Sequence, residues 1–352
     1  MKKIVLLSAL LLNAACTTPA GLTLADKADM PWPAAIAHRG ASFDAPESTR
    51  AAYVLARELG ADYLELDLQR SKDGVLIALH DDNLGRTTDV ATKFPERKDK
   101  PASEFSLAEL KSLDAGSWFN AQYPDRARPA FAGLPILTLD EVIDIAEAGS
   151  GKTPGLYIET KVPKLFPGIE QDLRNKLNER GWLDGKKRVV LQTFEKNSME
   201  LLAQHMPSTP KNMLLWVGDG YIDEAPSEPF NAETDKDWAT WYARQQPKDH
   251  AAFESWLDFA VAHGALAVGP SAALAKGGDQ SYMDLAQPWM NQMAHDKGLQ
   301  VHVYTVDDAE DFARLSEAGV DGFFSNRVDV LLSYLGRPLP RDKDAILSAE
   351  GF

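Results

Sequence analysis

Residues 63–80 read YLELDLQRSKDGVLIALH. The spacing of the charged and apolar residues in this stretch constrains the fold of the rest of the chain. The first part alternates with a period of two, so Glu65 and Asp67 lie on one face of a predicted strand and the leucines on the other. Carboxylates in the middle of a strand are costly to bury unless something neutralises their charge, and a metal ion would do so. A solvent-facing strand edge is the alternative explanation of the pattern.

The same stretch predicts a hairpin. Asp73-Gly74 is a strong signal for a two-residue turn of the primed type. Such a turn pairs Lys72 with Val75, and the same register sets Asp67 opposite His80. Directly opposed residues share a face, so we expect His80 to join the two carboxylates unless the register slips by one residue.

Outside this hairpin, short apolar strands alternate with amphipathic helices. Repeated strand–helix units predict parallel strands with right-handed crossovers, and eight such units favour an α/β fold, the (β/α)8 TIM barrel. An open doubly wound sheet is the alternative, but no G-x-G-x-x-G motif opens the first helix. The expected strands are 35–40, 63–69, 155–161, 189–194, 212–217, 266–270, 300–306 and 322–325, and the expected helices are 48–60, 169–180, 196–206, 253–263, 283–298, 308–319 and 328–335.

Two long segments interrupt this alternation in the predicted barrel domain, residues 34–336. An insertion of about residues 82–151 separates the second and third barrel strands, with helices expected near 107–113 and 139–148. An acidic, aromatic loop covers about residues 218–252, and loops of this length are usually functional or disordered. It is either a lid or headgroup pocket, or a solvated insertion that packs on itself. Residues 337–352 are predicted to be a C-terminal tail.

The N-terminus has the pattern of an export signal. A basic start and a nine-residue apolar run precede Cys16, and the run is too short to span a bilayer. Residues 1–15 are therefore predicted to be a signal peptide. The small residues before Cys16 resemble a bacterial lipoprotein processing site, which implies a lipidated Cys16 and a tether over residues 16–33. A plain cleaved signal with an incidental cysteine is the alternative.

Localisation follows from the same pattern. Thr17 rather than Asp follows the lipidated cysteine, which indicates the outer membrane, facing the periplasm, within the cell envelope. The 352 residues carry 37 Lys and Arg against 52 Asp and Glu, a net charge of −15. A field of that sign repels phosphate backbones, so nucleic-acid binding is not expected, and no protein partner is predicted.

Further chemically active side chains stand at predicted strand ends. His38 and Arg39 end the first strand, and Glu159 and Lys161 lie on the third. In a TIM barrel the C-terminal strand ends form the site, so these groups should meet the two carboxylates and His80. Three carboxylates with flanking histidines and cations indicate a site for a hard metal ion and an anion.

These residues resemble those of the glycerophosphodiester phosphodiesterase family. The family more often has Asn at Ser48, Trp at Tyr304 and Asp at Asn326. The similar segments span most of the chain: 38–42, 46–49, 65–67, 72–74, 79–81, 84–89, 113–119, 136–142, 157–161, 303–307 and 319–322.

The resemblance implies a TIM barrel that hydrolyses glycerophosphodiesters to an alcohol and glycerol 3-phosphate. It implies one divalent cation, with Ca²⁺ favoured and Mg²⁺ possible, because oxygen ligands suit hard cations and Ca²⁺ tolerates irregular coordination. The implied roles are these: Glu65, Asp67 and Glu159 bind the metal; Glu47 supports the metal shell; His38 and His80 are the acid/base pair; Arg39 and Lys161 bind substrate.

Other readings of the motifs stay open. A phospholipase D-like or phosphatidylinositol phospholipase C-like lyase barrel shares the paired histidines and a carboxylate triad. A non-catalytic envelope binding protein is a third possibility, although it has no need of all five groups. The other histidines carry no motif and are expected to be structural or surface residues: His205, His250, His263, His295 and His302.

Overall fold

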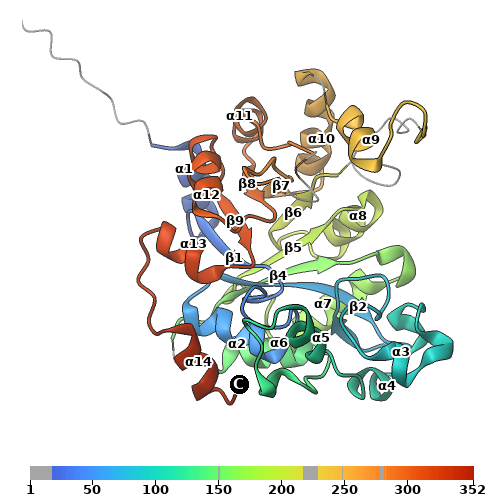
Figure 1. Cartoon of the computed structure of the whole chain (residues 1–352). Coiled ribbons are helices and arrows are strands. Elements are labelled where there is room, and N and C mark those ends of the chain that lie inside the picture. The colour runs from blue at the N-terminus through green and yellow to red at the C-terminus, as the bar shows by residue number, and fades with distance from the viewer. Residues whose placement is uncertain (1–17, 150, 217–228, 248, 278–280, 282) are drawn as a thin grey trace, which may run out of the picture.

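The computed structural model describes the chain except residues 1–17, 150, 217–228, 248, 278–280 and 282. Within that part, eight parallel strands close into a barrel, because β1 pairs with both β9 and β2. Figure 1 shows helices covering the outside of these strands. The predicted (β/α)8 barrel is confirmed. Its strands are β1 (Ala34–Ala37), β2 (Tyr63–Arg70), β4 (Gly155–Thr160), β5 (Val189–Thr193), β6 (Lys211–Leu214), β7 (Ala267–Gly269), β8 (Gln300–Val303) and β9 (Gly322–Ser325).

The outer helices follow the predicted amphipathic segments. The first ends at Gly60, whose φ of 98° is a left-handed conformation that glycine adopts without strain. The helix expected from residue 283 begins only at Pro288, since proline fits the first turn of a helix. The outer helices are α2 (Arg50–Leu59), α6 (Leu139–Glu147), α7 (Ile169–Glu179), α8 (Lys196–His205), α10 (His250–Ala262), α11 (Pro288–Asp296), α12 (Ala309–Glu317) and α13 (Val328–Tyr334).

The hairpin after β2 is present, but its predicted register is wrong by one residue. β3 (Leu76–Ala78) pairs antiparallel with β2, with Leu68 opposite Ala78. The backbone N–H of Ser71 donates to Val75, so the turn has three residues rather than two, and Gly74 takes a φ of 88°. A glycine at the last position of a three-residue turn produces this bulged geometry, which an Asp-Gly pair suits equally well.

His80 still lies beside the carboxylates, because it is beyond the end of β3. The strand alternation therefore no longer determines where its side chain points. Gln69 holds this bend: its Nε2 lies 2.9 Å from the carbonyl oxygen of Leu79 and 2.8 Å from that of Asp81. The structure therefore places His80 beside the carboxylates, as expected, but through the bend after β3 rather than through strand pairing.

The barrel interior is divided into an apolar layer and a polar layer. Ile36, Tyr63, Tyr157 and Phe324 fill the end at which the strands begin, and Tyr63 and Tyr157 meet edge to face at 5.6 Å. Because side chains alternate along a strand, the next inward positions lie two residues further on, toward the strand ends. Those positions carry His38, Glu65, Glu159 and Asn326, all polar or charged, so the apolar layer forms the floor of the site.

The segment before β1 differs from the predicted tether. α1 (Ala20–Ala28) packs across the apolar end of the barrel, with Ala25 fully buried. Asp321 fixes the segment that connects α1 to β1. Trp32 Nε1 donates to Oδ1 of Asp321 at 2.9 Å, and His295 Nε2 lies 2.7 Å from Oδ2. Residues 20–33 are thus part of the folded body. Residues 1–17, including the proposed signal peptide and Cys16, lie outside the described residues.

The C-terminal segment, predicted to be a tail, also packs against the folded body. α14 (Lys343–Ala349) contacts α2 and buries Ile346 and Leu347. Figure 1 shows α14 beside α2. In the described residues no helix combines the length and the apolar character that a membrane span requires.

The insertion between β3 and β4 folds around its own small apolar core, which includes Phe105, Leu110 and Ile136. Capping boxes at Ser106 and Thr138 start its two predicted helices. Its elements are α3 (Val90–Lys93), η1 (Pro95–Arg97), η2 (Ala102–Glu104), α4 (Leu107–Lys111), α5 (Ser117–Gln122), η3 (Pro129–Phe131) and α6, and a further short turn, η4 (Pro163–Leu165), follows β4.

The acidic aromatic loop is described only from residue 229 onward, apart from residue 248. α9 (Trp238–Gln245) carries most of its aromatic residues. Phe230 stacks on Trp238 at 4.3 Å, and Trp241 meets Tyr242 at 4.8 Å. Aromatic packing therefore orders this part of the loop, while residues 218–228 lie outside the described residues.

Candidate active site

A cavity of about 320 Å³ opens at the C-terminal ends of the barrel strands. It brings together seven of the eight residues predicted for the metal, the acid/base pair and the substrate; the eighth, Glu47, lies behind Arg39. One side of the cavity is charged and the other is aromatic. The lining residues are His38, Arg39, Glu65, Asp67, His80, Glu159, Lys161, Gln192, Phe194, Leu214, Trp216, Tyr304, Thr305 and Phe324.

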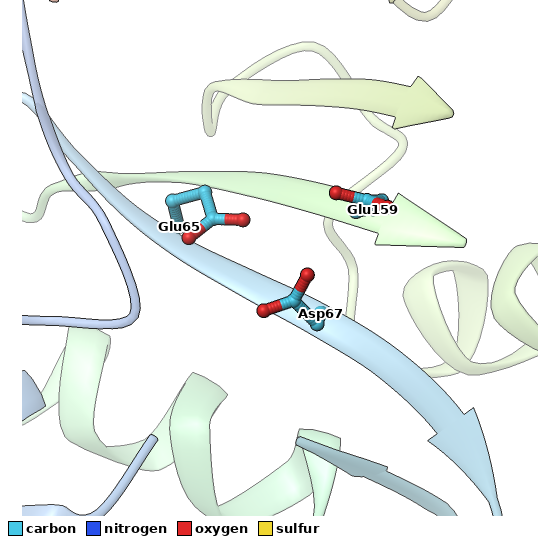
Figure 2. A group of neighbouring side chains, drawn as sticks. All are labelled: Glu65, Asp67 and Glu159. Atoms are coloured by element: carbon cyan, nitrogen blue, oxygen red, sulfur yellow. The ribbon is translucent and has the colours of Figure 1, made fainter. Parts of the chain in front are cut away.

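Three carboxylates form the centre of the charged side. Figure 2 shows Glu65 and Asp67 on β2 and Glu159 on the neighbouring β4. Asp67 and Glu159 are directly paired in the sheet register, and one oxygen from each of the three lies within 4.8 Å of the others. All three are buried, with at most 5% of the residue exposed.

Two cationic side chains partly neutralise this cluster. Lys161 Nζ lies 3.0 Å from Glu159 and 3.6 Å from Asp67. Arg39 Nε lies 3.3 Å from Asp67, and the backbone N–H of Arg39 donates to Glu65 at 2.7 Å. Three negative charges thus face two positive ones in a buried space, which leaves an excess of negative charge at the centre.

The pKa values of the carboxyl groups reflect that excess. Burial and the charge of Asp67 raise the pKa of Glu65 well above its ordinary value, and burial raises the pKa of Glu159 to about 7. Burial also acts on Asp67, but His80, Lys161 and Arg39 outweigh it and hold its pKa below the ordinary value. The cation-free cluster therefore tends to hold protons. Three converging oxygen ligands of this kind fit a hard divalent cation.

The turn after β1 requires unusual backbone geometry. Arg39 has a φ of 56°, and Gly40 follows with 86°. A Cβ on Gly40 would lie 2.6 Å from the carbonyl carbon of Ala52 in α2, so only glycine fits there. This turn is what points the Arg39 amide at Glu65 and its guanidinium at Asp67.

The two histidines have different partners. His38 Nδ1 lies 2.7 Å from Oδ1 of Asn326, a neutral amide. His80 Nδ1 lies 2.7 Å from Oδ1 of Asp81, a carboxylate. Burial, with help from Arg39, lowers the pKa of His38 to about 3; burial also lowers the pKa of His80, against the opposing charge of Asp67.

Arg86 is a site residue to which sequence reasoning gave no role, although it lies in the similar segment 84–89. It connects Asp81 and Glu47, with Nε 2.6 Å from Asp81 Oδ2 and Nη2 2.7 Å from Glu47 Oε1. Glu47 in turn lies 3.1 Å from Arg39 Nη1. Glu47 thus contacts the two arginines, and its link to the carboxylate cluster runs through Arg39.

A second overlooked group is the pair of amides behind Glu65. Gln192 Nε2 donates to Glu65 Oε1 at 3.2 Å, and Asn212 Nδ2 donates to Gln192 Oε1 at 3.3 Å. Both amides are buried and face inward from β5 and β6. They orient Glu65, but neither carried a motif that distinguished it from other strand residues.

The aromatic side of the cavity consists of Phe194, Trp216 and Tyr304, together with Leu214, and Phe324 of the floor also faces the cavity. Phe194 meets Trp216 at 6.1 Å and Tyr304 at 5.6 Å, both edge to face. Tyr304 is one of the positions at which the chain departs from the family pattern. This wall suits the apolar or cationic part of a substrate.

Two other sequence observations find structural explanations. Ser48 has a φ of 57°, a left-handed conformation that Asn tolerates better than most residues, which accounts for the usual family residue there. His302 lies in the floor, fully buried, with Nδ1 2.9 Å from the Tyr157 hydroxyl. Burial lowers the pKa of His302 to about 4, as expected of a structural histidine.

Comparison with known sequences identifies the family of this chain. The profile of the glycerophosphoryl diester phosphodiesterase family matches residues 38–330. A glycerophosphodiester phosphodiesterase of Bacillus subtilis is 34% identical over 298 residues, 84% of this chain and 84% of that protein. Another, of Caldanaerobacter subterraneus, is 28% identical over 299 residues, 85% of this chain and 96% of that protein.

Solved structures share the fold. A phosphodiesterase of Oleispira antarctica, in complex with the product sn-glycerol-3-phosphate, superposes with a TM-score of 0.61 at 23% identity, covering 87% of this chain and 97% of that one. A protein of Silicibacter pomeroyi gives a TM-score of 0.63 at 20% identity, covering 86% and 94%. Fold and sequence together define an enzyme of the phosphodiesterase class. The chain belongs to the glycerophosphoryl diester phosphodiesterase family.

The raised pKa of Glu159 predicts how the cation-free protein responds to pH. A carboxyl group whose folded pKa of about 7 exceeds its ordinary 4.5 stabilises the fold fully below pH 4.5. That contribution is lost as pH rises through about 7. We therefore expect the free energy of unfolding, measured by denaturant titration in chelator, to fall across this window in the wild type and less in Glu159→Gln.

A saturating divalent cation should remove most of this loss, because it takes the place of the proton on the carboxylate cluster. An equal pH dependence of the wild type and Glu159→Gln in chelator would contradict the assignment of the raised pKa to Glu159.

Proposed function

We propose that this protein hydrolyses glycerophosphodiesters to an alcohol and glycerol 3-phosphate, with a divalent cation and two histidines as proton carriers. The observation that carries the proposal is the convergence of Glu65, Asp67, Glu159, His38 and His80 on one cavity. The names of the relatives and the product in the Oleispira antarctica structure support this substrate class.

Glu65, Asp67 and Glu159 would hold the cation, with Ca²⁺ favoured and Mg²⁺ possible. Irregular carboxylate coordination suits Ca²⁺ better than the strict octahedron that Mg²⁺ requires. When bound, the cation supplies Lewis-acid polarisation of a phosphoryl oxygen and a fixed seat for the phosphate. The amides of Gln192 and Asn212 keep Glu65 oriented for this role.

Arg39 and Lys161 bind the phosphodiester anion. Both line the cavity beside the carboxylates. If a cation neutralised the carboxylates, the positive charges of Arg39 and Lys161 would be available to the substrate. Arg39 offers a planar fork of donors, which suits two phosphate oxygens at once. Glu47 and Arg86 hold that fork in place from behind.

His38 and His80 carry the protons of the displacement. A bond forms between an attacking oxygen and phosphorus while the bond from phosphorus to the alcohol oxygen breaks. His38 takes the proton of the attacking group, and His80 gives one to the departing alcohol. The attacking oxygen is that of water, or first the substrate's own glycerol hydroxyl, in which case water opens a cyclic intermediate in a second step.

The alternatives differ in their products. A lyase-type barrel would stop at the cyclic phosphate, and a binding protein would release no alcohol at all. The match over residues 38–330 favours the hydrolase over the lyase. The retention of both histidines and all three carboxylates argues against a non-catalytic binding protein.

Turnover of glycerophosphocholine tests the function directly. We expect release of choline and glycerol 3-phosphate, loss of activity in chelator and recovery with Ca²⁺ or Mg²⁺. Glu159→Gln should abolish the cation-dependent activity, because an amide cannot replace the charge of a carboxylate ligand. Glu96→Gln, at an exposed position in the insertion, is the matched control. Full activity of Glu159→Gln would remove that residue from the metal site, and accumulation of a cyclic phosphate would favour the lyase.

The two histidines can be separated by the leaving group. Replacing either His38 or His80 with Ala should lower turnover of a natural diester by about 100-fold or more. A nitrophenyl ester needs little protonation of its leaving group, so it should rescue His80→Ala and not His38→Ala. Rescue of His38→Ala instead would reverse the two roles. Loss of bound metal in both variants would make the histidines ligands.

We also propose that Cys16 is lipidated and anchors the protein in the cell envelope, at the outer membrane facing the periplasm. The support is the apolar run and the small residues that precede Cys16. Cys16→Ala should move the protein from the membrane fraction to the soluble envelope fraction, as judged by fractionation and immunoblotting. Unchanged membrane fractionation would mean that another part of the chain binds lipid.

A further inference from the structure

The polar groups that contact His38 determine which of its ring nitrogens carries a hydrogen more strictly than those that contact His80. Asn326 is the first residue after β9, and its Oδ1 lies 2.7 Å from His38 Nδ1. The hydroxyl oxygen of Ser42 lies 2.8 Å from the same Oδ1. Asn326 is also a position at which this chain departs from the family pattern, which has Asp.

The orientation of the Asn326 amide is fixed from its other side. Its Nδ2 lies 2.8 Å from Oδ2 of Asp307, which follows β8. Oδ1 of Asp307 accepts the backbone N–H of Asn326 at 2.7 Å and the hydroxyl of Ser325 at 3.0 Å. A carboxylate only accepts hydrogen bonds, so the NH₂ group must face Asp307. A flipped amide would place Oδ1 of Asn326 beside Oδ2 of Asp307, and two acceptor oxygens cannot form a hydrogen bond.

The proton on His38 follows from this orientation. Oδ1 of Asn326 only accepts, so Nδ1 of His38 must carry a hydrogen, and Nε2 of the neutral ring keeps a lone pair. The partner of His80 is different: Asp81 is charged, and a carboxylate stabilises an imidazolium, whereas an amide orients a ring without adding charge. Arg39, Asp67 and His80 are the other charged or titratable groups that act on His38.

We propose that Asn326, held by Asp307, is a positioning residue that fixes His38 in the Nδ1–H form and thereby makes Nε2 of His38 the proton acceptor of the reaction. The tautomer is a property of the free protein. Only the assignment of Nε2 as the reacting base rests on the proposed function.

Nitrogen NMR of the wild-type protein tests the tautomer without any substrate. Histidine-selective ¹⁵N labelling gives signals from seven residues, and His38→Ala assigns the one of interest. We expect His38 to show a protonated Nδ1 and an unprotonated Nε2 at neutral pH. A proton on Nε2, or a mixture of the two forms, would overturn the proposal. The tautomer is read from the wild-type spectrum, and a folded His38→Ala, checked by its unchanged remaining histidine signals, is needed only for the assignment.

Two variants then connect the tautomer with catalysis. Asn326→Leu keeps the approximate size but removes the acceptor, so we expect a mixture of tautomers and a kcat lowered about 10–100-fold, with KM little changed. Asn178→Leu, on the exposed side of α7, is the matched control. An unchanged His38 spectrum and an unchanged kcat in Asn326→Leu would also overturn the proposal.

An exchange of the two partners provides the rescue. Asp307→Asn combined with Asn326→Asp keeps an amide–carboxylate pair, and the carboxylate now accepts from His38 Nδ1. The Nδ1–H form should persist, and kcat should stay well above that of Asn326→Leu; loss of both in a folded double variant would contradict the acceptor role of position 326. A wild type that shows the expected tautomer but hydrolyses no glycerophosphodiester would refute the proposed function and leave the tautomer assignment standing.

Discussion

Burial of three carboxylates at the mouth of the barrel is the constraint on which the upper half of the structure depends. Glu65, Asp67 and Glu159 are nearly inaccessible to water, and such charges are tolerated only when counter-charges and hydrogen bonds surround them. The left-handed turn at Arg39, the placement of Lys161 and the amide of Gln192 all serve this requirement. Even so, the local charges do not balance, and this imbalance makes the cluster suitable for a cation.

The apolar floor beneath the carboxylates stabilises the fold despite that imbalance of charge. Tyr63 is two residues before Glu65 on β2, and Tyr157 is two residues before Glu159 on β4. One alternation along each strand therefore provides both a packed apolar layer and the charged layer above it. α1 packs across the opposite end of the barrel, and Asp321 fixes the segment between α1 and β1 through Trp32. Stability is thus concentrated at one end of the barrel and chemistry at the other.

The sequence predicted those features that a period of two or a chain of strand–helix units determines. Glu65 and Asp67 were placed on one face by alternation alone, and the barrel followed from eight repeats. The hairpin register could not be predicted, because Asp-Gly fits both a two-residue turn and a three-residue turn with a bulge. His80 reached its place only because the strand ends at Ala78.

Contacts between distant segments were the other part that periodicity could not predict. Asn326 meets His38 across 288 residues of sequence, and Arg86 joins Glu47 to Asp81 from within the insertion. Periodicity does not mark such residues, since each is an ordinary polar side chain in a loop or at a strand end, and family likeness at segment 84–89 and at Asn326 does not say which partner each contacts. α1 was missed for a similar reason: it packs on β8, where Gln300 Nε2 donates to the carbonyl oxygen of Gly21 across 279 residues of sequence.

The charge of the whole chain bears on the order in which the proposed cation and substrate would bind. A net charge of −15 repels a phosphodiester anion at long range, and the cation-free cluster, with three carboxylates against Arg39 and Lys161, sums to −1 locally when fully ionised. A divalent cation on the same groups changes that local sum to +1. With the proposed cation bound, the site would attract a phosphate within a molecule that otherwise repels it, since the local charge acts at contact distance while salt screens the distant charges. On the proposed function, this charge distribution would favour binding of the cation before the substrate, and Arg39 and Lys161 would then be able to turn from the carboxylates to the phosphate.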